Sequence, residues 1–400
     1  MSKAAAETGT ATSPPPRFPA TYWVLVIGYG ASRVGAVLVP YLTLYLVTQL
    51  HLSVDTAGQV LAAFGAGWVL GQPLFGAAAD RIGRKSTIVV SLALTATAYG
   101  LLARATTIPE LVALAAAIGL VFDAPRTAIS AWIADILTEQ QRPRGYGLQY
   151  WMINAGAAAS GIIGGYLASS HMGWLCTIDA LTCLAFALVV LALPATRDRP
   201  VNTPDPVGYR SVLSDRRLLS FTGISLATLT VYQQMVYGLP LAIHADGLSP
   251  AVYGAVNVAN AVTVLALQPL LQPLMDRTPP LRATAVGALA IGLGMGANGL
   301  AHGAAAFIAA TVVWTLGEMA FCVGAAAYVA GLAPDGARGR YLGVWGAAFG
   351  GSALAAPLIG AVALNRGSDW LWAGSAVLAS LCAAALALQA AGRRPAAPTA

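Results

Sequence analysis

Two stretches of this 400-residue chain carry nearly the same run of residues. QPLFGAAADR runs from Gln72 to Arg81 and QPLLQPLMDR runs from Gln268 to Arg277, a displacement of 196 positions. A long-range repeat is identified before any local pattern, because it fixes the architecture into which every motif must fit. The same displacement relates one group of residues to another: Arg142, Arg144 and Gly147 to Arg338, Arg340 and Gly343. The chain is therefore predicted to consist of two matching halves.

The composition places both halves in a membrane. Hydrophobic residues make up 57% of the chain and charged residues 10%, with a mean hydropathy of +0.69. A soluble domain carries roughly 25% charged residues, and a run of about 20 apolar residues spans a bilayer. We predict an all-α membrane protein of twelve transmembrane helices in two six-helix, pseudo-symmetric halves. The spans are residues 20–47, 57–79, 86–104, 109–135, 146–169, 173–193, 218–243, 250–274, 282–301, 304–331, 341–363 and 369–391.

The Lys and Arg residues predict the orientation. With the N-terminus inside, 18 of them fall in inward segments and 2 in outward loops, and Arg33 and Arg126 lie within spans. Basic loops stay on the cytoplasmic side during insertion, so we expect a multi-pass protein of the cell membrane with both termini cytoplasmic. The net charge of +6 then follows from topology. Lipid is the expected partner of the basic loops, and no nucleic-acid partner is expected.

The predicted organisation leaves no room for an extramembrane catalytic domain. P-loop, zinc and Gly-x-Ser-x-Gly motifs are not found, and the four cysteines have no metal-type spacing. We therefore expect no enzyme activity, no cofactor and no metal, and we expect a monomer. The predicted segments are a disordered cytoplasmic tail (1–17), an N-terminal six-helix bundle (18–193), a cytoplasmic linker (194–217), a C-terminal six-helix bundle (218–392) and a C-terminal tail (393–400).

The loop after the second span carries an ordered motif of glycine, acid and base. Its residues are Gly76, Asp80, Arg81, Gly83 and Arg84, followed by Lys85. This segment resembles the G-x-x-x-D-R-x-G-R-K loop between helices 2 and 3 of the major facilitator superfamily. The resemblance implies a conformational loop that braces the two halves on the cytoplasmic side in one state and releases them in the other. The second copy keeps Asp276 and Arg277 but continues with Thr-Pro-Pro.

The fifth span carries a stripe of small residues. Its members are Gly147, Gly156, Ser160, Gly161, Gly164 and Gly165. The stripe resembles the antiporter motif of the same superfamily, G-x8-G-x3-G-P-x2-G-G, with Ser160 in place of Gly and Gly161 in place of Pro. This resemblance favours export by antiport. The alternative is ordinary close packing of helices through small residues.

Ionisable side chains inside spans are costly and are functional candidates by default. Arg33 lies in span 1, Asp123 and Arg126 lie one helical turn apart in span 4, and Glu318 lies in span 10. Family resemblance places spans 1, 4, 7 and 10 around a central cavity. Glu318 has no basic residue near it in sequence, so it is the first candidate for binding and releasing the coupling proton. Asp123 is the second candidate, and it can instead form a switching or static pair with Arg33 or Arg126.

Aromatic and amide side chains on the same spans suggest a substrate surface. They are Tyr41, Tyr45, Tyr232, Gln233, Gln234, Tyr237 and Trp314. Drug-like molecules bind in mostly apolar and aromatic sites with a few polar anchors. We therefore predict a proton-coupled efflux antiporter for amphiphilic small molecules, similar to the drug:proton branch of the superfamily. The alternatives are a proton-coupled importer or facilitator of a sugar, peptide, amino acid or organic acid, and a membrane sensor or enzyme without transport.

Overall fold

The protein is a bundle of long helices in its computed structural model, which describes residues 18–138, 141–170, 174–194, 209–334 and 337–391. No strand occurs in these residues. The predicted tails, 1–17 and 393–400, and most of the predicted linker lie outside them. The first half holds α1 (Ala20–Val34), α2 (Leu38–Leu44), the π-helix η1 (Tyr45–Gln49), α3 (Val54–Arg81), α4 (Arg84–Leu102), α5 (Ile108–Phe122), α6 (Ala124–Ile136), α7 (Arg142–Ser170) and α8 (Trp174–Ala192).

The second half follows the same order of long helices. It holds α9 (Tyr209–Val212), α10 (Arg216–Tyr232), the 3-10 helix η2 (Gln233–Met235), α11 (Gly238–Ala245), α12 (Pro250–Arg277), α13 (Pro280–Ala297), the 3-10 helix η3 (Asn298–Leu300), α14 (Ala304–Leu332), α15 (Arg338–Leu364) and α16 (Ser368–Ala391). The short helix α9 lies within the predicted linker. All twelve predicted spans are thus helical, and the all-α prediction is confirmed.

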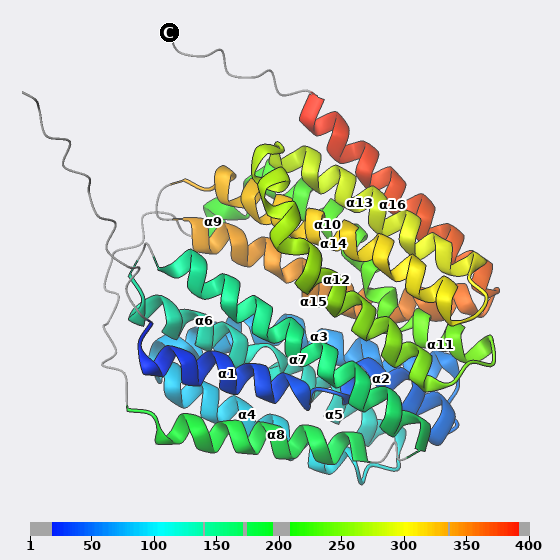
Figure 1. The fold of residues 1–400 in the computed structure, drawn as a ribbon, viewed down its shortest axis with the longest axis horizontal. Coiled ribbons are helices and arrows are strands. Elements are labelled where there is room, and N and C mark those ends of the chain that lie inside the picture. The colour runs from blue at the N-terminus through cyan, green and yellow to red at the C-terminus, as the bar shows by residue number, and fades with distance from the viewer. Residues whose placement is uncertain (1–17, 139–140, 171–173, 195–208, 335–336, 392–400) are drawn as a thin grey trace, which may run out of the picture.

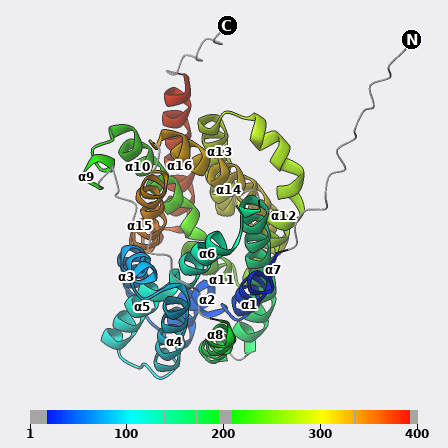
Figure 2. The same cartoon turned by 90° about the vertical axis from the view of Figure 1, so that its left-hand side faces the viewer.

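Helices α1 to α8 gather in the lower part of Figures 1 and 2, and most of the later helices form the upper part. Helix pairs that join the halves among the described residues include α3 with α15, α7 with α12, and α2 with α11. The limits of the two predicted bundles remain a prediction, but the contacts between sequence-distant helices are those of two bundles packed side by side.

Membrane-length helices account for most of the described residues. Nine helical segments within them are long and apolar enough to cross a bilayer. The other three predicted spans lie in α3, in α7 and in the α10–α11 segment. Helices α3 and α7 each pack against a helix of the other half. Small residues that permit close helix approach are favoured there over the large apolar residues that face lipid.

Three spans are interrupted rather than straight, which the sequence analysis did not predict. Span 1 breaks at 35–37 between α1 and α2, span 4 breaks at Asp123 between α5 and α6, and span 7 breaks at 233–237. Pro125, at the start of α6, has no backbone N–H group, so it cannot continue the backbone hydrogen bonds of α5. In membrane proteins such breaks are tolerated where protein, not lipid, surrounds the freed backbone groups.

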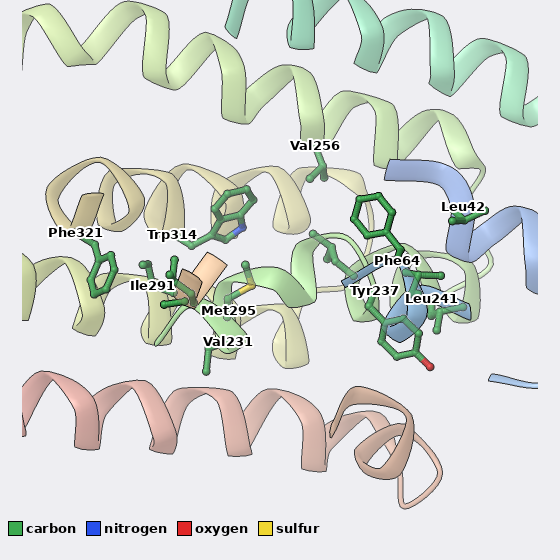
Figure 3. Packing of buried hydrophobic residues seen from close by; sticks show 14 of the residues in the cluster. Leu42, Phe64, Val231, Tyr237, Leu241, Val256, Ile291, Met295, Trp314 and Phe321 are labelled. Carbon is green, nitrogen blue, oxygen red and sulfur yellow. The ribbon is translucent and has the colours of Figure 1, made fainter. Parts of the chain in front are cut away.

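One large apolar cluster contains buried residues of both halves, and a separate cluster lies within the first half. Figure 3 shows Leu42 and Phe64 of the first half beside Tyr237 and Leu241 of the second, while Trp314 lies further along the bundle. Burial of these side chains between helices fixes the distance between the halves at this end, and the polar residues described next lie around this cluster.

Candidate functional site

Glu318 lies in the middle of α14, which is unbroken from Ala304 to Leu332. Its Oε2 accepts a hydrogen bond of 3.0 Å from Nδ2 of Asn260 on α12, which also donates to Thr315. Tyr232 on α10 interacts with the same carboxyl group. Among the described residues, no Lys or Arg forms an ion pair with it. The carboxyl group is therefore held by neutral side chains from two other helices of the second half, α10 and α12.

Glu318 also faces the first half. Tyr150 on α7 lies within electrostatic range of its carboxyl group. Trp314, one turn earlier on α14, is fully buried and packs edge-on against Tyr232, with ring centroids 5.8 Å apart. These contacts bring Glu318, Tyr232 and Trp314 together, and they add Asn260, which was not selected from the sequence.

Asp123 occupies the break between α5 and α6, where it is buried. Arg126 donates to both of its carboxylate oxygens from its Nε and one terminal nitrogen. Gln72 on α3 donates a further hydrogen bond of 2.8 Å from its Nε2. Of the two predicted cation partners, the described contacts therefore join Asp123 to Arg126. Charge-assisted, two-point contacts of this kind fix geometry strongly.

Arg33 lies apart from this pair. Its guanidinium group lies over the Phe122 ring, 5.7 Å from the centroid. Its Nε is buried and has no hydrogen-bond partner among the described residues. Arg33 also lines a cavity of about 40 Å³ together with Tyr29, Tyr99 and Asp179, a volume that is large enough for water.

Asp179 on α8 is a buried charged residue that the sequence analysis missed. Its two carboxylate oxygens accept hydrogen bonds of 3.0 and 2.9 Å from the backbone amides of Val37 and Leu38. These amides lie at the start of α2, directly after the break in span 1. The position of an acid inside the predicted span 173–193 was the available signal, because such residues are rarely neutral to function.

A second, apolar cavity of about 140 Å³ lies between the halves. Its wall includes Phe64, Trp68 and Phe122 from the first half, and Gln233 and Tyr237 from the second. Pockets for drug-sized ligands measure roughly 300–1,000 Å³. In this conformation the cavity is smaller than such a ligand, so binding requires the halves to move.

Cross-half hydrogen bonds close one end of the molecule, hereafter the closed end. Tyr237 Oη donates to the carbonyl oxygen of Val54 (2.7 Å), and Thr43 Oγ1 donates to that of Val236 (3.0 Å). Asn365 Nδ2 donates to Asp55 Oδ1 at 2.7 Å. Tyr237 therefore contributes both to the cavity wall and to the closure of this end.

The remaining predicted substrate residues lie in helix packing. Tyr41 donates a hydrogen bond of 3.2 Å to the Gly161 carbonyl and packs edge-on against Tyr253 of the other half. Tyr45 lies in η1 against the apolar cluster. Gln234 donates to the Ala356 carbonyl at 2.9 Å, and its Oε1 is buried without a partner among the described residues. These contacts hold helices together.

The conformational loop motif between α3 and α4 is partly described. The side chains of Gly76, Asp80 and Asp276 lie outside the described part of the chain. Gly83 has φ +87°, a left-handed conformation that favours glycine. The exposed side chains of Arg81 and Arg277 end α3 and α12.

Two cations that follow Gly83 anchor this loop within the first half. Arg84 lies 3.4 Å from Asp135 at the end of α6. Lys85 donates a hydrogen bond of 2.9 Å to the Leu191 carbonyl at the end of α8. The described contacts of the motif thus join α4 to its own half.

The small-residue stripe on α7 faces the other half along part of its length. A Cβ added to Gly161 would lie 3.1 Å from the Gly254 carbonyl oxygen, and one on Gly165 would lie 3.1 Å from the Gly254 Cα. Gly156 and Gly164 instead approach α1 and Tyr41, and Ser160 Oγ donates to the Ala36 carbonyl at 2.9 Å. A Cβ added to Gly147 would have no neighbouring atom within 4 Å. The antiporter-like motif therefore forms helix contacts.

The family profile described as Major Facilitator Superfamily matches residues 23–247 and 237–400. The chain is 24% identical over 355 residues to the uncharacterized MFS-type transporter YqjV of Bacillus subtilis, covering 86% of each chain. It is 32% identical over 202 residues to the multidrug resistance protein MdtH of Yersinia enterocolitica, and this match spans 48% of each chain.

Solved structures share the fold at low identity. The POT family transporter PepTSo aligns with a TM-score of 0.78 at 15% identity, over 94% of this chain and 99% of that one. The nucleoside transporter NupG aligns with a TM-score of 0.76 at 13% identity, over 92% of this chain and 98% of that one. Each likeness concerns the arrangement of helices.

Proposed function

Since this chain belongs to the Major Facilitator Superfamily and is thus a multi-pass membrane transporter of small molecules, we propose that it exports amphiphilic, drug-like molecules in exchange for protons. The observation that carries this proposal is the environment of Glu318. A carboxyl group held by Asn260 and Tyr232 can gain a proton without leaving a buried cation unpaired. Asp123, by contrast, is committed to Arg126 and Gln72.

The cavity between the halves indicates the class of substrate. Its wall is dominated by Phe64, Trp68, Phe122 and aliphatic side chains, with Gln233 and Tyr237 as polar groups. Such a surface favours an amphiphilic molecule over a sugar, which needs many hydrogen-bonding partners. The half-length likeness to the multidrug resistance protein MdtH supports the same class.

The proposed mechanism is alternating access with both termini in the cytoplasm. With this orientation, the closed end faces outward, and the cavity communicates with the inside when the opposite end separates. Protonation of Glu318 then changes the relative stability of the two states, because a transporter responds only to a difference in free energy between them. The halves move about the midplane, where ligand and coupling ion meet.

Transport in purified proteoliposomes tests the proposal. A lipophilic fluorescent cation serves as substrate, and an imposed pH gradient serves as the only energy source. We expect uphill movement of the dye opposite to the proton flow, with loss of that movement when a protonophore is added. Protein-free liposomes with the same gradient provide the background, because such dyes cross lipid slowly on their own.

The competing import function has a different outcome in the same vesicles. Radiolabelled sugars, peptides, amino acids and organic acids are tested with the gradient in both directions. Accumulation of one of them together with protons, with no gradient-driven movement of dyes, would replace the export proposal with import. Absence of flux for every compound and every gradient would favour a sensor.

Orientation has its own test, because the transport direction depends on it. Single cysteines are introduced near Asp55, His244 or His302 in a cysteine-free chain, and others near Lys85. We expect a membrane-impermeant thiol reagent to label the first group in intact cells and to leave the second unlabelled. The reverse pattern would place both termini outside.

A further inference from the structure

The break in span 1 leaves the first amides of α2 without the helical partners that an unbroken helix would provide. Asp179 on α8 fills this role with both of its oxygens, at 3.0 Å from the Val37 amide and 2.9 Å from the Leu38 amide. The Val37 amide also donates to the Gly35 carbonyl at 2.7 Å. A side chain distant in sequence therefore determines where α2 begins and how it is oriented.

A small cavity lies beside Asp179, and the described ion pairs do not include its carboxylate. Its side chain and that of Arg33 line the same cavity of about 40 Å³, but no described ion pair joins them. The other titratable groups lining this cavity are Tyr29, Tyr99 and Cys183. The two amide hydrogen bonds are therefore the direct polar contacts of the carboxylate among the described residues.

Helix α2 contacts two helices of the second half, α11 and α12, at the closed end. Thr43 donates to the Val236 carbonyl, two residues before α11 begins. Tyr41 packs against Tyr253 of α12, with ring centroids 5.1 Å apart. Gly254 of α12 also approaches the Tyr41 hydroxyl closely. Both contacts require α2 to be held in a fixed position.

We propose that Asp179 is a positioning residue for transport, which holds α2 in the place where its side chains close this end of the cavity. The carboxylate fixes α2 to α8, and α2 in turn contacts α11 and α12. In the opposite state, α2 no longer contacts those helices, so its position there needs less support. Loss of the Asp179 contacts is thus expected to weaken the closed state more than the open one.

The opposite prediction follows if Asp179 only supports folding. In that case, its removal would loosen the whole first half and expose buried positions at both ends. A positioning role instead changes the two ends in opposite directions, because the ends of an alternating-access transporter open in turn. Reciprocal changes in accessibility therefore distinguish the two roles.

The test uses two single-cysteine forms of the full chain, purified in detergent. One keeps only the native Cys322, one turn beyond Glu318 on α14. The other lacks the native cysteines and carries Ala361→Cys, at a buried α15 position close to Gly58 of α3. Asp179→Asn, which keeps one acceptor oxygen, and Asp179→Ala, which keeps none, are introduced into both forms. The rate of modification by a water-soluble maleimide is measured.

We expect the Ala361→Cys probe to react about three to ten times faster in Asp179→Asn, as loss of a single net hydrogen bond implies. The effect should be larger in Asp179→Ala, and Cys322 should react more slowly in both variants. Ser375→Ala provides the matched control, because Ser375 lies at the corresponding position of the second half, 196 residues later. It should change neither rate.

Two outcomes would overturn the proposal. Unchanged labelling of the Ala361→Cys probe in Asp179→Asn would show that the closed end does not depend on this carboxylate. Faster labelling of both probes together would assign Asp179 to general stability. If Asp179→Ala is not monodisperse by size-exclusion chromatography, Asp179→Asn and its control decide between these outcomes. The test needs neither a known substrate nor a known orientation.

Discussion

In the first half, the Asp123 carboxylate lies at a helix break and binds Arg126, whereas in the second half Glu318 lies inside an unbroken helix and binds Asn260. The difference extends to the remaining buried acid. Asp179 holds the start of α2 in the first half, and the position 196 residues later is Ser375. Two halves with the same helical order therefore place their charges in different surroundings.

This comparison separates two uses of a carboxyl group in a membrane. A carboxylate with a cation or two backbone amides fixes geometry, and its protonation leaves those donors unsatisfied. A carboxyl group among neutral side chains can change charge while its amide and hydroxyl neighbours keep their hydrogen bonds. The first half is thus expected to determine shape, and the second half to respond to protons.

The largest expected effect is the loss of coupling in Glu318→Gln. Glutamine keeps an oxygen that can accept from Asn260 Nδ2 but cannot take up a proton. Gradient-driven dye flux should fall at least about 100-fold, the lower part of the range that proton transfer contributes in enzymes. Dye binding, measured by fluorescence on the purified protein, should remain.

Glu110→Gln is the matched control for this prediction. Glu110 lies in the first turn of α5, at the very end of span 4, where it is fully exposed. It accepts hydrogen bonds of 3.1 Å from the Thr106 and Thr107 amides. The control should transport at the wild-type rate. Full gradient-driven flux in Glu318→Gln would move the proton site to Asp123 and reverse the comparison between the halves.

Asp123→Asn is expected to destabilise the protein rather than to uncouple it. The variant leaves Arg126 without its carboxylate at a helix break. Removal of one member of a buried pair costs about 3–5 kcal/mol, and the half-exposed Arg126 side chain reduces this to about 2 kcal/mol, because solvent screens the charge. The apparent melting temperature in detergent should fall, together with dye binding.

A double-mutant cycle with Arg126→Gln sharpens this prediction. If the two residues act as a pair, the double variant should lose less stability than the sum of the single variants. Additive losses would show that Asp123 interacts mainly with Gln72 and the backbone. Unchanged stability with lost coupling in Asp123→Asn would give Asp123 the role assigned to Glu318.

Gly254→Ala tests whether the close contact between α7 and α12 determines the equilibrium between the closed and open states of the closed end. The added Cβ would lie 2.7 Å from the Gly161 carbonyl oxygen and 2.9 Å from the Gly165 Cα. Overpacking of this kind costs about 1–3 kcal/mol, and here the cost falls on the state in which α7 and α12 touch. Labelling of the Ala361→Cys probe should increase about tenfold. Gly223→Ala on α10, where nothing lies within 4 Å, should leave the labelling rate unchanged.

Most of the fold was predictable because membrane helices need long apolar runs, and those runs are visible in the sequence. The breaks were harder to predict. Pro125, shortly after Asp123, was a usable signal in span 4, because proline cannot continue the hydrogen-bond ladder. The break at 35–37 has no comparable signal, since the groups that satisfy its amides belong to Asp179, about 140 residues later in the chain.

The candidate site was predictable as a set of charges, and its pairing was not. Sequence separation of three residues predicted the Asp123–Arg126 contact correctly. Arg33 was equally plausible as a partner, but its position over Phe122 depends on how α1 packs against α5. Asn260 could not be singled out among the uncharged polar residues, because its contact with Glu318 depends on the register between α12 and α14.

The smallest expected effect concerns the N-terminal ends of α1 and α10, the first long helices of the two halves. Helix α10 begins after Asp215, which accepts hydrogen bonds from the Arg217 and Leu218 amides, whereas α1 begins after Pro19 without a side-chain cap. Partial burial works to raise the pKa of Asp215, but these amides and the Tyr341 hydroxyl, 3.0 Å away, outweigh it and hold the pKa below its usual value. The carboxylate form therefore stabilises the folded state.

Asp215→Ala, which removes the cap, should lower the stability of the protein at neutral pH by about 1 kcal/mol, the typical value for a helix cap. A depressed pKa contributes stability above the unfolded value of about 3.9, and this contribution is lost as the pH falls through the lower, folded value. The difference in melting temperature between wild type and variant should thus be constant above about pH 5 and shrink below pH ~4. Tyr341→Phe, which removes one of the three donors, should show a smaller difference with the same pH dependence. A difference that persists undiminished at low pH would mean that Asp215 acts through packing, and that the two halves begin in equivalent ways.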